Sequence, residues 1–425
     1  MKRILWTLSS LLAAVGIGAA AIAALNLRGE EPLPSAETLQ STPEMVARGE
    51  YLARAGNCMA CHTVAGGAPF AGGLGIETPF GVVHSSNLTP DKDHGIGTWT
   101  SAEFWRAMHN GRSKDGRLLY PAFPYTNYTQ VTREDSEAIF AYLQSLPPAP
   151  VPNRAHALRF PYDTQVALAV WRALFFSPGA PAPDSQQTAE YNRGAYLVNG
   201  LGHCTACHTP RNALGATTQA KAFTGGLIPV QNWYAPALNA AGEAGVQKWP
   251  LEDVVALLKT GVAAQGSVIG PMAEVVFRST QYLSDADARA MAVYLQALPE
   301  HDRKAPKAPP APAAAMARGA KVYEQQCAQC HGEQGQGEPG TFPPLAGNRA
   351  VVLADPTNLV RVVLQGGYLP ATAGNPRPHG MPPFQHVLSD EDVAAVATFV
   401  RNSWGNQAAG VGTIEVYRAR ERRGL

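Results

Sequence analysis

Charged residues are scarce in this chain of 425 residues, and the two signs nearly cancel. Aspartate, glutamate, lysine and arginine make up 16% of the sequence, and the formal net charge is +1. A protein that binds nucleic acid needs concentrated positive charge. The balance therefore gives no reason to expect nucleic acid, or a strongly charged substrate, as a partner.

Two further patterns are missing from the sequence. No glycine fingerprint for a dinucleotide opens a helix after a strand, because the glycine-rich stretch GEQGQGEPG at 332–340 directly follows a cysteine pair. Runs of alternating apolar residues that would pair into sheets are also missing. No group of residues resembles a catalytic site for a substrate. The sequence therefore predicts a mainly α-helical protein that is not itself an enzyme.

The N-terminal segment has no charge between Arg3 and Arg28. This apolar run is longer than that of a secretory signal peptide and close to the ~20 residues that span a bilayer. The sequence Ala-Ile-Ala at 21–23 could still serve as a cleavage site, so residues 1–30 are either a signal peptide or a membrane anchor. The length favours the anchor, and a buried core helix is a poor alternative because the run is terminal. In both cases the rest of the chain is exported, with Lys2 and Arg3 left on the cytoplasmic side.

No cysteine lies outside three copies of the pattern C-x-x-C-H. The pattern is that of covalent c-type haem attachment. Two thiols one helical turn apart can bond the vinyl-derived carbons of a porphyrin, and the histidine after them can bind the iron. The sequence thus predicts three covalently bound haem c groups. They would be attached through Cys58, Cys61, Cys204, Cys207, Cys327 and Cys330, with proximal iron ligands His62, His208 and His331.

Cysteine pairs also occur in disulfides, in thioredoxin-like redox sites and in zinc sites. A disulfide does not require a histidine after every pair. A thioredoxin-like site has one motif in a βαβ context, not three. Zinc would require the pairs to meet in space, although they are far apart in the sequence. Haem attachment is therefore favoured over all three uses.

The three motifs lie inside a longer repeat. An Arg-Gly pair and a short helical segment precede each motif, and an amphipathic helix follows it. Each of these last helices is expected to have a hydroxyl N-cap with an aspartate three residues later, at Thr132, Ser284 and Ser389. The glycines of the Arg-Gly pairs are expected to let the first helix cross close to an aromatic residue of the last. The pairs are Gly49 with Tyr142, Gly194 with Tyr294 and Gly319 with Phe399.

The repeat predicts three tandem cytochrome c-type domains, at 42–148, 187–300 and 316–406. Pro/Ala-rich stretches, expected to be extended, separate them. The first linker, 149–186, is expected to contain an aromatic-rich helix at 159–176, which either packs between domains or forms a docking surface for a partner or the membrane. The second linker covers 301–315, and a tail at 407–425 ends the chain.

The distal iron ligand is expected between each motif and the last helix of its repeat. A methionine thioether at this position raises the reduction potential of a c-type haem. Met272 and Met381 lie beside prolines in such loops and are the expected ligands of the second and third haems. In the first repeat the corresponding residue is Phe123, in YPAFPY, and a phenyl ring has no lone pair for iron.

Other residues do not fill this gap in the first repeat. Met59 lies between the two cysteines, and Met108 belongs to a helix that is expected to turn it inward. The histidines at 84, 94 and 109 are more typical of surface or hydrogen-bonded positions. We therefore expect the first haem to be five-coordinate or to have a ligand other than methionine, with a potential below those of the other two.

The sequence resembles the three-haem cytochrome c subunit of bacterial membrane-bound dehydrogenases that act on alcohols, gluconate, other sugar acids or aldehydes. The resemblance covers nearly everything after the N-terminal segment. It is carried by ARGEYLARAGNCMACHT, TPFGVVHSSNLTPDKDHGIGTWT, LYPAFPYTNYT, GPMAEVVFRSTQYLSDADARAMAVYLQALP and AAVATFVRNSWGN. Many relatives have YPAMPY, whereas a branch that serves molybdenum-containing hydroxylases has the phenylalanine.

The resemblance implies an electron-transfer subunit at the periplasmic face of a bacterial inner membrane. It would take electrons from a separate dehydrogenase of the flavin, quinoprotein or molybdenum type and pass them to membrane quinone or a terminal oxidase. Backbone carbonyls of Pro90, Pro236 and Pro344 would receive the proximal imidazoles. The main alternative is a multihaem peroxidase or a haem-based sensor that uses an open first haem.

Overall fold

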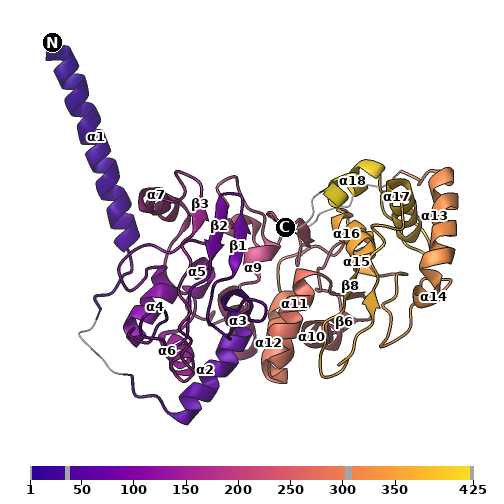
Figure 1. Cartoon of the computed structure of the whole chain (residues 1–425), viewed down its shortest axis with the longest axis horizontal. Helices are drawn as coiled ribbons and strands as arrows, with labels where there is room; N and C mark the ends of the chain where they lie inside the picture. Colours follow the sequence, from indigo (N-terminus) through magenta and orange to yellow (C-terminus); the bar gives the residue numbers. More distant parts are fainter. Residues whose placement is uncertain (1, 34–38, 302–308, 422–425) are drawn as a thin grey trace. The chain divides into compact units, whose positions relative to one another are not determined.

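The computed structural model describes residues 2–33, 39–301 and 309–421 (Figure 1). The chain forms two compact units. The first consists of Met1–Ala53, Cys58–Pro183 and Asn212–Ala216, and the second of Arg54–Asn57, Asp184–Arg211 and Thr217–Leu425. Both are mainly helical, as the sequence predicts, and the strands are two to four residues long.

The first unit contains the N-terminal helix and the first motif. Its helices are α1 (Lys2–Leu27), α2 (Pro43–Ala55), α3 (Cys58–His62), α4 (Ser101–Asn110), α5 (Tyr125–Tyr128), α6 (Arg133–Gln144) and α7 (Gln165–Phe175). Its strands β1 (Gly75–Thr78), β2 (Gly81–His84) and β3 (Ala157–Leu158) form one antiparallel sheet in the order β1-β2-β3. Because β3 belongs to this sheet, the predicted linker at 149–186 packs on the first unit for part of its length.

The second unit contains the other two motifs. The part around the second motif has α8 (Ala189–Tyr196), the π-helix η1 (Leu197–Leu201), α9 (Thr205–His208), the 3-10 helices η2 (Gln219–Lys221) and η3 (Thr280–Tyr282), α10 (Leu251–Thr260), α11 (Pro271–Arg278) and α12 (Asp285–Gln296). Two antiparallel strand pairs lie between these helices: β4 (Gly226–Ile228) with β5 (Trp233–Ala235), and β6 (Val262–Ala263) with β7 (Gly266–Ser267).

The rest of the second unit surrounds the third motif. It has α13 (Ala313–Gln326), α14 (Ala328–His331), α15 (Arg349–Val352), α16 (Thr357–Gln365), α17 (Asp390–Arg401), α18 (Thr413–Glu421) and the antiparallel strand pair β8 (Gly367–Tyr368) with β9 (Gly380–Met381). Residues 302–308 of the predicted second linker lie outside the described residues, and α13 begins before that linker was expected to end. Helix α18 lies in the predicted tail, where the side chain of Val416 is fully buried beside α16 and α17.

The predicted N-caps are confirmed in all three last helices. Each hydroxyl accepts a hydrogen bond from the backbone N–H of the aspartate three residues later. That interaction satisfies one of the amide groups that a helix start leaves unpaired. The same aspartates also pair with the arginines that precede the crossing glycines: Arg48 with Asp135, Arg193 with Asp287 and Arg318 with Asp392. Cap and ion pair together fix the last helix against the first.

The predicted helix crossings are confirmed as well. A Cβ atom added to Gly49 would lie 1.8 Å from the backbone oxygen of Ala138, and one added to Gly194 would lie 2.0 Å from that of Ala290. At Gly319 the corresponding distance to the oxygen of Ala395 is 2.2 Å. No larger residue fits at these distances without moving a helix. The expected aromatic partners lie at the same crossings, with Cβ atoms 2.7–2.8 Å from the added atom: Tyr142, Tyr294 and Phe399.

The distance in sequence from the crossing glycine to the first cysteine differs between repeats. It is eight residues in the third, nine in the first and ten in the second. In the third repeat, α13 runs directly to Cys327. In the first, Asn57 takes a left-handed conformation with φ 51° before Cys58. In the second, the π-helix η1 and His203, with φ 37°, take up the extra residues. Local backbone changes thus bring three different spacings to the same kind of motif helix.

Candidate haem sites

The three short helices α3, α9 and α14 carry the cysteines and histidines of the motifs. All six cysteines are free, which contradicts the disulfide alternative. Within the described residues, no group of three or more His, Cys, Asp or Glu side chains is arranged to hold a metal ion, so the zinc alternative has no site there. Cys61 and Cys207 are exposed, and the other four thiols are partly exposed.

Each proximal histidine donates a hydrogen bond from Nδ1 to a backbone carbonyl. The acceptors are Ser86 for His62, at 2.7 Å, and Pro236 for His208, also at 2.7 Å. The third pair is His331 with Pro343, at 3.0 Å. A donated Nδ1–H leaves the lone pair of Nε2 free, which is what an iron ligand requires.

These contacts confirm one of the three predicted acceptors and correct two. Pro236 is correct, whereas Ser86 replaces Pro90 and Pro343 replaces Pro344. The acceptor is a main-chain oxygen, so its position depends on how the loop folds and not on which side chain follows. A proline in a similar sequence was therefore an unreliable guide.

Burial keeps the ligand groups neutral. It lowers the pKa of His62, His208 and His331, and the carbonyl contacts oppose part of that shift. Burial also raises the pKa of the Cys58 and Cys204 thiols to about 12. Neutral imidazole is the form that binds iron. The three imidazoles therefore fit haem c in their protonation as well as in their place after each cysteine pair.

For each motif, the charge of the first cysteine contributes to the raised pKa of one tyrosine, which sequence reasoning did not assign to the sites. Burial is the main cause of a raised pKa for all three tyrosines, and the neighbouring cysteine adds to it. The pairs are Tyr128 with Cys58, Tyr294 with Cys204 and Tyr323 with Cys327. The three come from different elements, α5, α12 and α13, so no common spacing in the sequence could have identified them.

The expected methionine ligands lie in the predicted stretches. Met272 follows Pro271 at the start of α11 and packs with Leu257 against a small apolar cluster. Met381 is in β9, opposite Gly367, and packs against the core beside α16 and α17. Both side chains are partly buried. Their ligation of iron stays a prediction.

Phe123 packs against two tyrosines and offers no ligand atom. Its ring centroid is 5.4 Å from that of Tyr128 and 6.4 Å from that of Tyr125. Met108 is buried in α4, as predicted.

Two histidines of the first repeat have other contacts. His84 Nδ1 lies 2.9 Å from the backbone oxygen of Ala155, which agrees with the hydrogen-bonded role that the sequence suggested. The ring of His109 stacks on Trp105, and its buried Nδ1 has no hydrogen-bond partner among the described residues.

Two family descriptions match this chain. "Cytochrome c" matches residues 46–147, and "Cytochrome C oxidase, cbb3-type, subunit III" matches residues 314–400. These matches include the first and third motifs, and the second motif at 204–208 lies outside both.

Individual relatives cover more of the chain. It is 41% identical over 382 residues to the "Alcohol dehydrogenase (quinone), cytochrome c subunit" of Gluconobacter oxydans (strain 621H). This alignment covers 86% of this chain and 80% of that protein. It is 39% identical over 390 residues to the "Gluconate 2-dehydrogenase cytochrome c subunit" of Pantoea cypripedii, covering 87% and 88%. It is 34% identical over 431 residues to the "Fructose dehydrogenase cytochrome subunit" of Gluconobacter japonicus, covering 94% of this chain and 87% of that protein.

Proposed function

This chain belongs to the cytochrome c subunits of membrane-bound dehydrogenases, which are electron-transfer subunits and not catalytic ones, and we propose that it relays electrons through three haem c groups. The electrons would come from a partner dehydrogenase in the periplasm. They would leave to membrane quinone or to a terminal oxidase.

One observation supports a count of three haems. All three C-x-x-C-H motifs, including the second, share the same local arrangement, in which the histidine Nδ1 is held by a backbone carbonyl at 2.7–3.0 Å. Cys58, Cys61, Cys204, Cys207, Cys327 and Cys330 would hold the macrocycles, and His62, His208 and His331 would bind the irons. The bound haem supplies a one-electron couple whose potential the axial ligands and the burial adjust.

The distal residues distinguish the first haem from the others. Met272 and Met381 would complete the second and third sites, while Phe123 offers no donor to the first. We therefore expect the potential of the first haem to be the lowest.

Membrane attachment would come from α1. Its stretch Arg3–Leu27 is long and apolar enough to cross a bilayer, with a mean hydropathy of 2.1, and almost all of it is exposed; Asn26, near its C-terminal end, is buried. This exposure argues against the alternative of a buried core helix. An uncleaved α1 would hold both units at the periplasmic face, close to membrane quinone.

The haem count is tested by mass spectrometry of the purified, exported protein. We expect the polypeptide mass plus three haem groups. The double variant Cys204→Ser/Cys207→Ser should lose one haem, as should the matched double variant Cys327→Ser/Cys330→Ser. Two haems in the wild type and no loss in the first variant would show that the second motif is not a haem site.

The direction of transfer is tested with the complex isolated from membranes. Co-purification should identify the dehydrogenase, and its substrate should reduce the haems. Reoxidation of the haems by a soluble quinone analogue would support quinone as the acceptor. Reoxidation only in membranes that retain a terminal oxidase would support the oxidase. Haems that the dehydrogenase and its substrate cannot reduce would contradict the relay.

A further inference from the structure

Helix α7 has an apolar exposed face and turns its charged residue inward. Arg172, its only charged residue, points inward and is 3% exposed. Val166, Val170 and Leu174 recur every four residues on the opposite face, and they are 75%, 37% and 64% exposed. A helix of a water-soluble protein normally turns its apolar face inward and its charges outward. The outer face of α7 is therefore suited to an apolar environment.

The loop before α7 continues this exposed apolar surface. Phe160 is 81% exposed, and Tyr162 is 38% exposed, with its ring against that of Phe80. Arg159 is exposed next to them. Aromatic rings with a neighbouring basic residue are typical of segments at the boundary between lipid headgroups and acyl chains.

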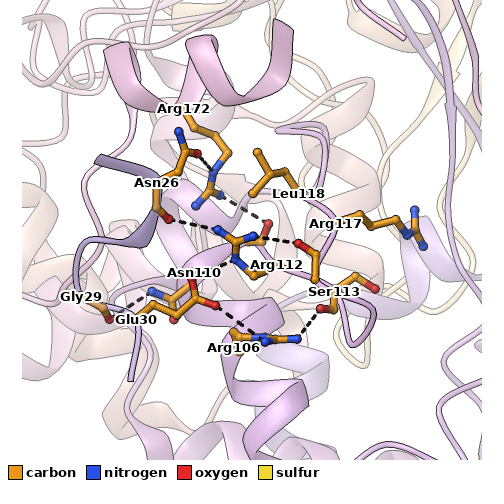
Figure 2. A network of polar contacts seen from close by, with 12 residues as sticks. Asn26, Gly29, Glu30, Arg106, Asn110, Arg112, Ser113, Arg117, Leu118 and Arg172 are labelled. Carbon is orange, nitrogen blue, oxygen red and sulfur yellow. Dashed lines mark hydrogen bonds and ion pairs between the residues drawn. The ribbon is translucent and has the colours of Figure 1, made fainter. Parts of the chain in front are cut away.

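Polar contacts tie α7 to the C-terminal end of α1. Asn26, near the end of α1, donates from Nδ2 to the backbone oxygen of Ala169, at 2.9 Å. Its Oδ1 accepts a hydrogen bond from Arg172 Nε, also at 2.9 Å (Figure 2). Two residues later, Arg28 donates to the backbone oxygen of Phe176 and to the hydroxyl of Ser177. The amide of Asn26 thus serves both the backbone and the buried arginine of α7.

The same end of α1 is also bound to the body of the first unit. Arg112 donates to the backbone oxygen of Asn26, at 3.2 Å, and to the carboxylate of Glu30, at 2.9 Å. Glu30 is also paired with Arg106, and Asn110 donates to the backbone oxygen of Gly29 (Figure 2). The position of α7 relative to the exit of α1 is therefore fixed by several side chains.

The length of α1 places these contacts near the membrane surface. About 20 helical residues cross the hydrocarbon core of a bilayer. The uncharged part of α1 begins at Ile4, so Asn26 lies just beyond that length. Because α7 contacts Asn26 directly, it lies at the depth of the headgroups whenever α1 spans the bilayer.

We propose that α7 is an interfacial helix, which lays Val166, Val170 and Leu174 on the outer leaflet beside the point where α1 emerges. The apolar face of α7 would contact the same lipid bilayer that α1 crosses. This inference rests on the proposed membrane attachment through α1. It assigns to α7 the role of a second contact that fixes the orientation of the first unit on the membrane.

The test uses the full-length haem-loaded protein in vesicles of phosphatidylethanolamine and phosphatidylglycerol that contain a lipid with a diazirine in its acyl chain. After photolysis, mass spectrometry locates the lipid adducts. We expect adducts on α1 and on peptides covering 159–176. We expect none on the peptide containing Val151, which is a similarly exposed valine (38%) of the same unit. Adducts on α1 without any on 159–176 would overturn the inference and leave the anchor intact, whereas no adducts on α1 would refute the anchor itself.

A matched pair of variants sharpens the result. Val170→Gln should reduce the α7 adducts severalfold, because it places an amide in the lipid-facing row. Val151→Gln should leave them unchanged. The labelling is repeated with the dehydrogenase complex. If the α7 adducts are present in the isolated subunit and disappear in the complex, α7 is a protein interface and the proposal is wrong; their persistence supports it.

Discussion

Glu243 and His208 are connected through a single peptide group. His208 Nδ1 donates to the carbonyl of Pro236, at 2.7 Å. The N–H of the same peptide belongs to Ala237 and donates to Glu243 Oε2, also at 2.7 Å. Glu243 is buried, and Tyr234 donates a second hydrogen bond to the same oxygen, at 2.8 Å. The carboxylate thus polarises the peptide that receives the proximal imidazole.

This connection is weaker in the first motif and missing from the third. In the first, the peptide is formed by Ser86 and Asn87, and its N–H donates to the neutral amide oxygen of Asn153, at 2.7 Å. In the third, the residue after Pro343 is Pro344, which has no N–H to donate. The peptide that accepts from the proximal histidine therefore donates to a carboxylate in the second motif and to a neutral amide in the first. In the third motif it has no N–H to donate.

Replacing Glu243 by glutamine should raise the reduction potential of the second haem. The amide oxygen of the glutamine can still accept both hydrogen bonds, but the negative charge that favours the ferric iron is gone. The expected rise is on the order of tens of millivolts. A potentiometric titration followed at the Soret band should show one of three steps shifted. Glu252→Gln, at an exposed residue of α10, is the control and should leave all three steps in place.

The reciprocal change is Asn153→Asp, which adds a charge behind the first histidine. It should lower the potential of the first haem, by less than the Glu243 effect because Asn153 is exposed and its charge is screened by water. A shift of the first step in the opposite direction would show that the peptide connection does not transmit charge.

The replacement Phe123→Met tests the predicted difference at the first haem. The new thioether should give that iron a methionine ligand and raise its potential. The near-infrared band of methionine-ligated ferric haem should grow by about half, since two such sites would become three. Phe123→Leu removes the same ring contact with Tyr128 without adding a donor, so it should change neither quantity. An unchanged band in Phe123→Met would mean that residue 123 does not face the iron.

The features that could be predicted from the sequence are those with a local chemical requirement. A hydroxyl before a helix predicts a cap, and a glycine in register with an aromatic residue predicts a close crossing; both were correct in all three repeats. The C-x-x-C-H pattern likewise identified the residues of each candidate site within one short segment. In each case a specific side chain, or the lack of one, decides the structure.

The features that were missed depend on the backbone or on residues distant in the sequence. Two of the three histidine acceptors were wrong because any residue can present a carbonyl. The strands are too short to show an alternating pattern. The contact between Asn26 and Arg172 joins residues 146 positions apart, and neither residue type indicates its partner. Helix α18 has few apolar residues and is held by packing of Val416 and by an ion pair between Arg420 and Asp390.

The replacement Gly194→Ala should disrupt the second motif. The added methyl group would lie 2.0 Å from the backbone oxygen of Ala290, so α8 and α12 would have to separate. Overpacking of this kind costs about 3 kcal/mol or more, and we expect low yield of protein with a complete set of haems. Gly242→Ala in the same unit meets nothing within 4 Å and should be close to neutral. Equal haem content and protease resistance in the two variants would contradict the role of the crossing.

The ion pair between Arg193 and Asp287 joins the same two helices and allows a matched comparison. Arg193 Nε and Nη2 donate to the two carboxylate oxygens of Asp287, each at 2.8 Å, and Asp287 is buried. Arg289 and Glu190 also connect α12 and α8, at 2.9 Å, but both are exposed. We expect Arg193→Ala to destabilise the region by about 1–2 kcal/mol, since it leaves a buried carboxylate without its partner, and Arg289→Ala by less than about 0.5 kcal/mol. Pulse proteolysis in urea, with the cuts mapped to 187–300, measures the loss of stability in each variant. Equal losses in the two variants would mean that burial does not strengthen the Arg193 pair.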